Sequence, residues 1–219
     1  MVEYDKDAIV YPYITEYLRK EIPERKGILK ELEEYAKENS VPIVQPETAK
    51  FLETLICLKR PARILEVGCA IGYSAILMAQ YLEKGGSITT LEWDADMTEV
   101  ARGNIKKAGL EDTITVINND AKEVLPTLTG EYDVIFLDGP KAHYIYMLND
   151  CIRLLKKGGV LISDNILYKG MIADDEHVIR RKITIVKRLR RFISAQMQRE
   201  ELETVILPLG DGVTVAVKK

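Results

Sequence analysis

Acidic side chains close several apolar runs of this sequence, and they are its most evident chemical groups. Glu66 and Glu92 close the runs "ARILEV" and "SITTLE", Asp138 closes "YDVIFLD", and the pair Asp164 and Asn165 closes "GVLISDN". Ligands of open α/β sheets bind beyond the carboxyl ends of the strands. We therefore expect these oxygen donors to meet around one pocket, which suits a cationic cofactor and a metal ion.

The segment from Glu66 to Ser74, "EVGCAIGYS", is typical of a strand, a tight loop and the start of a helix. Its glycines allow the backbone to approach a ligand closely, and the helix start offers free N–H groups. In a dinucleotide site this loop would face a pyrophosphate, which the carboxylate of Glu66 would repel. S-adenosylmethionine fits better, because it carries a sulfonium and an ammonium group and no phosphate.

Further acids complete the predicted cofactor site. Glu92 follows Gly72 by twenty residues and ends the next strand, where a carboxylate can accept hydrogen bonds from both ribose hydroxyls. Asp120, in "NNDA" after the third strand, can accept a hydrogen bond from an adenine amino group. Aspartate at such a position is also a common helix N-cap, so both roles stay open for Asp120.

Asp138, Asp164 and Asn165 are hard oxygen donors without His or Cys among them, which suits Mg²⁺ or Ca²⁺ rather than zinc. Each one alone is explained by solvation or helix capping, but the three together favour a metal site. Lys141 lies three residues after Asp138, so one helical turn would bring it back over the metal. A lysine beside a cation in a closed pocket has its charged form disfavoured, which would make it a usable base.

The hydrophobic periods divide the chain into a helical preface and an alternating core. Residues 1–58 show helical spacing, with Pro23 placed in a first turn. Residues 62–165, the cofactor and metal core, alternate strand-like and helical runs, which predicts parallel strands joined by right-handed helical crossovers. A basic helix over 175–199 and a strand pair over 201–219, around a Gly-Asp-Gly turn, complete a single domain of residues 1–219.

Composition narrows the class of protein. With 219 residues and 47% hydrophobic content, the chain can bury one core. No apolar run reaches the roughly 20 residues of a membrane span, so we expect a cytoplasmic protein without a membrane partner. The three cysteines lack C-x-x-C spacing, which argues against a disulfide framework or a zinc site. The net charge of −3 argues against DNA binding or general coating of nucleic acid, but it leaves a local basic patch open.

The loop "LEVGCAIGYSAI", the stretch "DGPKAHY" and the "DN" pair resemble the cation-dependent class I O-methyltransferases of the catechol and caffeoyl-CoA type, over nearly the whole chain. The resemblance implies a Rossmann-like α/β fold, with a seven-stranded, mostly parallel sheet, an antiparallel last strand and helices on both faces. It implies S-adenosylmethionine and Mg²⁺ as cofactors, Lys141 as the base, and a homodimer. The metal ligands that it implies are Asp138, Asp164 and Asn165. The cofactor positions that it implies are Val44, Glu66, Gly68, Ser74, Glu92, Asp120 and Asp138.

Within this family, "YAKENSVPIVQPE", "DNILYKGMIADD" and "PLGDGV" most resemble the members that convert 5-hydroxyuridine to 5-methoxyuridine at the wobble position of bacterial tRNA. Apolar residues at helical spacing between 179 and 197 leave a basic face, which would grip phosphates of the tRNA anticodon region. The cations of this segment are Arg180, Arg181, Lys182, Lys187, Arg188, Arg190 and Arg191. A solvated helix surface, balanced by nearby acids, explains the same face equally well.

Two other functions stay open. The same chemistry on a small catechol or phenylpropanoid would not need the basic face, so its cations would not affect activity. A cofactor-binding or RNA-binding module without turnover would not need the set of Asp138, Lys141, Asp164 and Asn165. The presence of that set argues for an enzyme.

Overall fold

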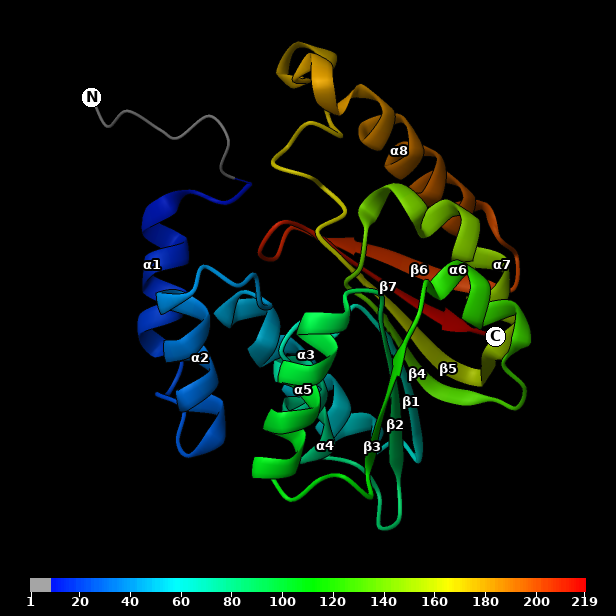
Figure 1. The fold of residues 1–219 in the computed structure, drawn as a ribbon. Helices are drawn as coiled ribbons and strands as arrows, with labels where there is room; N and C mark the ends of the chain where they lie inside the picture. Colours follow the sequence, from blue (N-terminus) through cyan, green and yellow to red (C-terminus); the bar gives the residue numbers. More distant parts are fainter. Residues whose placement is uncertain (1–8) are drawn as a thin grey trace.

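The structure is a computed structural model that describes residues 9–219, and these residues form a seven-stranded sheet with strand order β3-β2-β1-β4-β5-β7-β6 (Figure 1). The strands are β1 Arg63–Val67, β2 Ser87–Glu92, β3 Ile114–Asn118, β4 Tyr132–Leu137, β5 Leu155–Asp164, β6 Leu202–Leu207 and β7 Val213–Lys218. β1 to β5 pair in parallel, whereas β7 runs antiparallel to β5 and β6. The predicted sheet, with its antiparallel last strand, is confirmed. Residues 1–8 of the expected helical preface lie outside the described residues.

Helices cover both faces of this sheet. The α-helices are α1 Pro12–Glu21, α2 Ile28–Glu38, α3 Pro46–Lys59, α4 Tyr73–Ala79, α5 Ala95–Lys107, α6 Ala121–Val124, α7 Tyr144–Leu154 and α8 Ile183–Gln198. The short 3₁₀ turns are η1 Leu125–Thr127, η2 Lys141–His143, η3 Asp175–His177 and η4 Arg180–Lys182. α3, α4 and α5 pack on one face with α1 and α2 outside them, and α6, α7 and α8 cover the other (Figure 1). None of the helices in residues 9–219 is long and apolar enough to cross a lipid bilayer.

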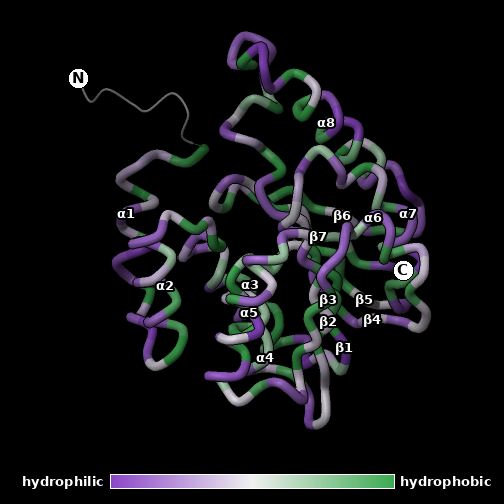
Figure 2. Tube along the Cα trace, in the orientation of Figure 1, coloured by the Kyte–Doolittle hydropathy of each residue, from purple (hydrophilic) through white to green (hydrophobic). Residues whose placement is uncertain are grey.

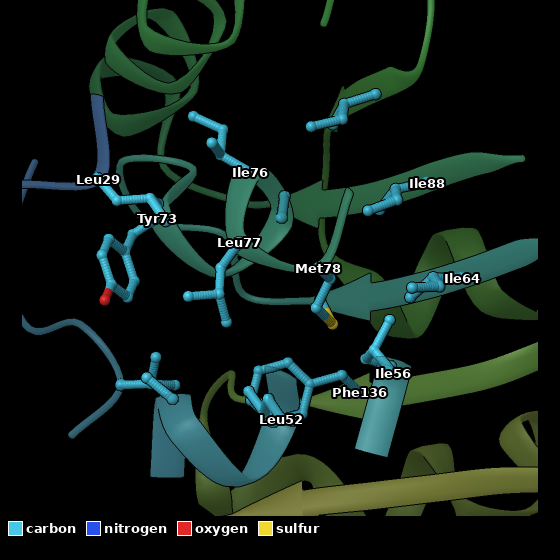
Figure 3. Packing of buried hydrophobic residues seen from close by; sticks show 14 of the residues in the cluster. Leu29, Leu52, Ile56, Ile64, Tyr73, Ile76, Leu77, Met78, Ile88 and Phe136 are labelled. Carbon is cyan, nitrogen blue, oxygen red and sulfur yellow. The ribbon is translucent and has the colours of Figure 1, made fainter. Parts of the chain in front are cut away.

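Alternation of side chains along the strands builds a hydrophobic core on each face of the sheet. In β4, Val134 and Phe136 belong to the core under α3 and α4, whereas Ile135 and Leu137 belong to the core under α7 and α8. Figure 3 shows Phe136 beside Leu52 of α3 in the first of these cores. A strand buried on both faces reads as a continuous apolar run. Figure 2 accordingly shows largely hydrophobic strands, whereas α8 alternates between hydrophobic and hydrophilic residues.

The expectation of one basic helix over residues 175–199 is wrong. Two 3₁₀ turns, η3 and η4, occupy the first part of this segment, and α8 begins only at Ile183. The side chain of Asp174 accepts the Glu176 N–H at 2.9 Å and so caps η3. Ile179 then has extended backbone angles, φ −69° and ψ 126°, which interrupt a helical path. The cations of the segment therefore belong to separate elements.

Proline placement also differs from the expectation. Pro23 lies in the link between α1 and α2 rather than in the first turn of a helix. Pro12 and Pro46 begin α1 and α3 instead. The first turn of a helix tolerates proline because its N–H groups have no partner within the helix. The sequence pattern thus identified the helices correctly but assigned the wrong proline to a helix start.

The centre of the sheet contains a close approach at Gly68, directly after β1. Gly68 has a φ of +91°, and a Cβ added there would lie 2.6 Å from the Asp138 carbonyl oxygen after β4. The Gly68 N–H donates to Leu91 O of β2 at 2.8 Å, and the Asp138 N–H donates to Val67 O at 2.9 Å. These contacts hold the carboxyl ends of β1, β2 and β4 together, where the predicted site residues lie.

Replacing Gly68 with alanine is expected to lower the free energy of unfolding by about 2 kcal/mol or more, because a positive φ disfavours a side chain and the added methyl group meets backbone. The matched control is Gly103→Ala in α5, where a Cβ meets no atom within 4 Å. It is expected to stabilise the protein by about 0.5–1 kcal/mol. Urea unfolding measures both changes, and a stabilising effect of both substitutions would contradict this account of Gly68.

Candidate active site

Two adjoining cavities lie at the carboxyl ends of the parallel strands. The larger, of about 550 Å³, is lined by residues 39–45, by the loop after β1, and by residues at the ends of β2, β4 and β5. The second, of about 520 Å³, lies toward β3 and α6. Gly68, Trp93 and Pro140 line both cavities. Each volume falls in the range of small-molecule sites, which is roughly 300–1,000 Å³.

The loop between β1 and α4 forms one wall of the larger cavity. Gly68 and Ser74 line this wall, and Gly72 stands at the N-terminus of α4 with a φ of +85°. Val44, which is buried, lines the same cavity from the segment before α3. The structure therefore brings these predicted cofactor positions together, although they are separated by up to thirty residues along the chain.

Glu92, at the end of β2, binds the backbone of this loop. Its Oε2 accepts the N–H groups of Cys69 at 3.1 Å and Ala70 at 2.9 Å, and its Oε1 accepts the Asp94 N–H at 3.0 Å. A carboxylate offers about four acceptor positions. One position thus remains for a ligand hydroxyl, fewer than the two that the sequence analysis envisaged for a ribose.

Glu66, in β1, lines neither cavity, unlike the other predicted cofactor positions. Its side chain is fully buried, and its Oε2 accepts the Thr90 hydroxyl at 2.5 Å. Burial raises the pKa of Glu66 to about 7; hydrogen bonds from Ser74 and Thr90 lower it, and the charges of Asp138 and Glu92 raise it. Glu66 therefore bonds β2 through one oxygen, whereas its buried Oε1 has no hydrogen-bond partner among the described residues.

Asp120 lines the second cavity and also caps α6. Its Oδ1 accepts the Lys122 N–H at 2.9 Å, and its Oδ2 lies 3.2 Å from Lys122 Nζ. Burial raises the pKa of Asp120, but the hydrogen bonds and charge of Lys122 outweigh it, so the pKa lies below its usual value. The exposed indole of Trp93 lines the same cavity. A charged acceptor and a flat aromatic ring are thus both available to a ligand there.

Asp138, Asp164 and Asn165 meet at the wall of the larger cavity. Asp164 is 1% exposed, and burial, followed by the charge of Asp138, raises its pKa to about 7. A cation relieves such repulsion between carboxylates, and all three side chains offer hard oxygens, so the residues fit Mg²⁺. Residues 9–219 hold no metal-binding cluster of three or more His, Cys, Asp or Glu side chains.

Lys141 returns to Asp138, as their spacing predicts. Its Nζ lies 2.8 Å from Asp138 Oδ1, and η2 begins at Lys141. Tyr144, fully buried, donates its hydroxyl to Leu137 O at 2.9 Å and lies 3.3 Å from Asp164 O. Burial and the charges of both aspartates raise the pKa of Tyr144 well above its usual value. Its neutral hydroxyl therefore ties the ends of β4 and β5, a role that the sequence analysis did not assign.

Asp211 is a second residue of this region that the sequence analysis missed. It lies in the Gly-Asp-Gly turn between β6 and β7, and its Oδ1 accepts the Lys169 N–H at 2.6 Å. Burial raises the pKa of Asp211, whereas the Lys169 N–H and the charge of Lys141 lower it. Its own charge raises the pKa of Asp164. A third carboxylate thus acts on Asp164, although its only sequence signal was that of a turn.

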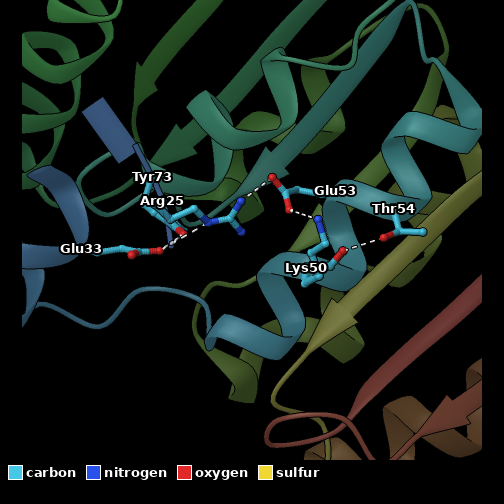
Figure 4. A network of polar contacts seen from close by, with 6 residues as sticks. All are labelled: Arg25, Glu33, Lys50, Glu53, Thr54 and Tyr73. Carbon is cyan, nitrogen blue, oxygen red and sulfur yellow. Dashed lines mark hydrogen bonds and ion pairs between the residues drawn. The ribbon is translucent and has the colours of Figure 1, made fainter. Parts of the chain in front are cut away.

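A polar network joins the helical preface to the start of α4 (Figure 4). Tyr73, the first residue of α4, donates its hydroxyl to Glu33 of α2 at 2.5 Å, and Arg25 lies 3.6 Å from the same carboxylate. Arg25 also pairs with Glu53 of α3, which Lys50 contacts at 3.3 Å. Because Tyr73 lines the larger cavity, the network connects the preface to the wall of the site.

Comparisons with known proteins agree with this geometry. A family model described as O-methyltransferase matches residues 20–219. The catechol O-methyltransferase of Niastella koreensis is 32% identical over 185 residues, which cover 80% of this chain and 82% of that protein. The caffeoyl-CoA O-methyltransferase of Populus kitakamiensis is 31% identical over 186 residues, which cover 80% and 77%. An O-methyltransferase from Bacillus cereus, solved in complex with SAH, has a TM-score of 0.84 at 27% identity, covering 94% of this chain and 97% of that chain.

The buried carboxyl group of Glu66 predicts a pH-dependent stability. Because its pKa rises from 4.5 to about 7 on folding, the folded protein keeps this proton where the unfolded chain loses it. The contribution of Glu66 is full below pH 4.5 and is lost as pH rises through 7, so the free energy of unfolding of the metal-free protein should fall between pH 5 and 8.

Glu66→Gln keeps the shape of the protonated side chain and removes its titration. It is expected to flatten this decline and to exceed the wild type in stability at pH 8 by up to roughly 3 kcal/mol. Guanidinium unfolding at pH 5, 6, 7 and 8 in the presence of a chelator measures the difference. Asp164 titrates in both proteins, so a residual slope is expected. Parallel pH profiles for the two proteins would show that Glu66 is not the group responsible.

Proposed function

Because this chain belongs to the O-methyltransferase family and is an S-adenosylmethionine-dependent O-methyltransferase of the catechol and caffeoyl-CoA type, we propose that it methylates the 5-hydroxyl of a wobble uridine in tRNA and that it requires Mg²⁺. The observation that carries the catalytic part is the contact between Lys141 and Asp138 at 2.8 Å, beside Asp164 and Asn165. These residues share a cavity with the glycine-containing loop after β1.

The division of roles follows from the side chains. Asp138, Asp164 and Asn165 would hold the cation through oxygen atoms. Bound Mg²⁺ would make a hydroxyl group that it coordinates lose its proton more readily. Lys141 pairs with Asp138 as an ammonium; a cation bound at Asp138 would disfavour this charged form, and the neutral amine would then receive that proton. The methyl donor and the acceptor oxygen would then meet in one enclosed space, where proximity favours transfer.

We assign the two ends of S-adenosylmethionine to the two cavities. The larger cavity, with its carboxylates and the loop at Gly68 and Ser74, suits the sulfonium and ammonium groups. The second cavity, with Asp120 and Trp93, suits the adenine ring. Glu92 lines the larger cavity near their junction and has an acceptor position left for a ribose hydroxyl.

Cations from α8 support a substrate that carries phosphates. Arg188 lies over the ring of Tyr146, with its guanidinium carbon 5.3 Å from the ring centre. His143 lines the second cavity, and its pKa is lowered by burial and by the charges of Lys122 and Arg188. Positive charge from α8 and α6 therefore acts at the rim of the site, where flanking phosphates of an RNA would need it.

Not every cation of the basic segment is available to a substrate. Arg190 donates to Ile172 O at 2.9 Å and to Met171 O at 3.3 Å, and it pairs with Asp175 at 2.5 Å. It therefore fixes the loop before η3 against α8. Within residues 180–191, the exposed cations that form no ion pair with other described residues are Arg180, Arg181, Lys187 and Arg191.

The alternative substrate is a small catechol or phenylpropanoid. Similar proteins are named catechol and caffeoyl-CoA O-methyltransferases, and a cavity of about 550 Å³ suits a small aromatic molecule. For such a substrate the basic rim, formed by the cations of residues 180–191, would be solvated surface. The two proposals share every catalytic residue, so only the acceptor and the basic rim distinguish them.

Purified protein with labelled S-adenosylmethionine and Mg²⁺ is expected to transfer label to tRNA that carries 5-hydroxyuridine, and a chelator is expected to abolish the transfer. The matched control is the same tRNA with unmodified uridine, which lacks the acceptor oxygen. Scintillation counting of purified tRNA measures the result. Label that enters only a panel of small catechols would overturn the tRNA substrate, and transfer that survives chelation would overturn the Mg²⁺ requirement.

Charge reversal separates the two substrates. Arg181→Glu and Arg188→Glu are each expected to raise the KM for tRNA by roughly tenfold or more, because a phosphate contact becomes a repulsion. The control, Lys106→Glu, makes the same charge change on an exposed residue of α5, on the other face of the sheet. It is expected to leave the KM for tRNA unchanged. Steady-state kinetics on the modified tRNA measure this, and an unchanged KM in all three variants would favour the small substrate.

A further inference from the structure

We propose that Asp211 is a positioning residue, which holds the loop after β5 in the conformation that directs Asn165 to the cavity. The inference rests on the metal site proposed above and adds to it a residue from the other end of the chain. Asp211 itself is no ligand in this account. It acts on the metal only through the backbone that it fixes.

The loop after β5 has an unusual backbone. Asn165 has a φ of +55°, Tyr168 of +48° and Lys169 of +56°, and Gly170 follows with +75°. A left-handed conformation costs a residue other than glycine of the order of 1–3 kcal/mol and persists only where neighbouring structure imposes it. Three such residues in five positions therefore require strong external contacts.

The turn between β6 and β7 supplies those contacts. The side chain of Asp211 accepts the Lys169 N–H at 2.6 Å. The Leu167 N–H donates to Asp211 O at 3.0 Å, and the Ile166 N–H donates to Gly212 O at 3.0 Å. Three backbone donors of the loop thus end on two consecutive residues of the turn. The side-chain bond reaches Lys169, one of the left-handed positions.

The turn is itself held between two neighbours. A Cβ on Gly212, which has a φ of +85°, would lie 2.3 Å from Leu167 Cγ of the loop. A Cβ on Gly210 would lie 2.6 Å from Thr48 Oγ1 of α3. Because both glycines are in close contact, the carboxylate between them has little freedom. Figure 1 shows this turn reaching from β6 and β7 toward the side of the molecule that carries α3.

Asp211→Ala and Asp211→Asn test whether the carboxylate acts through its hydrogen bond or its charge. Alanine removes the acceptor, whereas asparagine keeps an oxygen for the Lys169 N–H and removes the charge. Titration with Mn²⁺, followed by electron paramagnetic resonance, measures the dissociation constant without turnover. We expect Asp211→Ala to weaken Mn²⁺ binding by about 10–100-fold and Asp211→Asn to stay within about fivefold of the wild type.

Hydrogen exchange of the metal-free protein provides a second readout. Mass spectrometry of a peptide that spans residues 163–172 is expected to show faster exchange in Asp211→Ala and near-normal exchange in Asp211→Asn. The matched control is Asp133→Ala, which removes a carboxylate that accepts the Ala62 and Arg63 N–H groups at 2.9 and 2.8 Å near the start of β4. Its loss is expected to leave both Mn²⁺ binding and this peptide unchanged.

A double variant guards against a folding defect in Asp211→Ala. Adding Lys169→Gly removes the strain at φ +56°, because glycine adopts this region readily. If Asp211 acts by holding the loop after β5, the double variant Asp211→Ala with Lys169→Gly should recover at least part of the lost Mn²⁺ affinity. A variant that had lost its fold for other reasons would not recover.

The outcomes separate this inference from the function on which it rests. Normal Mn²⁺ binding by Asp211→Ala would overturn the inference and leave the metal site standing. Equal losses in Asp211→Ala and Asp211→Asn, with exchange unchanged, would assign the effect to charge and overturn it as well. A wild-type protein that binds no Mn²⁺ would overturn the proposed metal site and the inference together.

Discussion

The gathering of negative charge at one edge of the sheet is the constraint on which the rest of this structure depends. Glu66, Glu92 and Asp164 are almost completely buried at the ends of β1, β2 and β5, and Asp138 follows β4. Buried carboxylates are stable only when hydrogen bonds, cations or protons compensate them. N–H groups of the loop donate hydrogen bonds to Glu92, and Lys141 forms an ion pair with Asp138. For Glu66 and Asp164 the cost of burying a charge is only partly offset, and burial raises the pKa values of both to about 7.

The incomplete compensation of these buried carboxylates explains which ligands the site suits. A cationic methyl donor and a divalent metal ion would both lower the potential that the carboxylates create. Membership of the O-methyltransferase family agrees with the methyl donor. The pyrophosphate of a dinucleotide would add to the repulsion. The same glycine-containing loop therefore acquires its specificity from the acids around it rather than from its own backbone.

Side chains of the surrounding helices keep these acids in place. Tyr144 ties the ends of β4 and β5 through its hydroxyl, and the network of Arg25, Glu33 and Tyr73 joins the helical preface to the cavity wall. On the opposite side Arg190 of α8 secures the loop that follows β5. α7 within the alternating core, and α2 and α8 outside it, thus restrain the strand ends and loops around the site.

The sequence by itself determined the alternating elements, the edge of the sheet where the acids lie, and the contact of Lys141 with Asp138, because periodicity and short spacing report local backbone geometry. The homodimer and the cytoplasmic location stay predictions. Only the tertiary structure decided that Glu66 lines neither cavity, that Arg190 binds backbone carbonyls, and that Asp211 binds the loop after β5. Asp211 and Lys169 are 42 positions apart, and no local pattern encodes such a contact. It exists because β7 inserts antiparallel beside β5 and brings its turn against the loop, which only packing of the whole chain can specify.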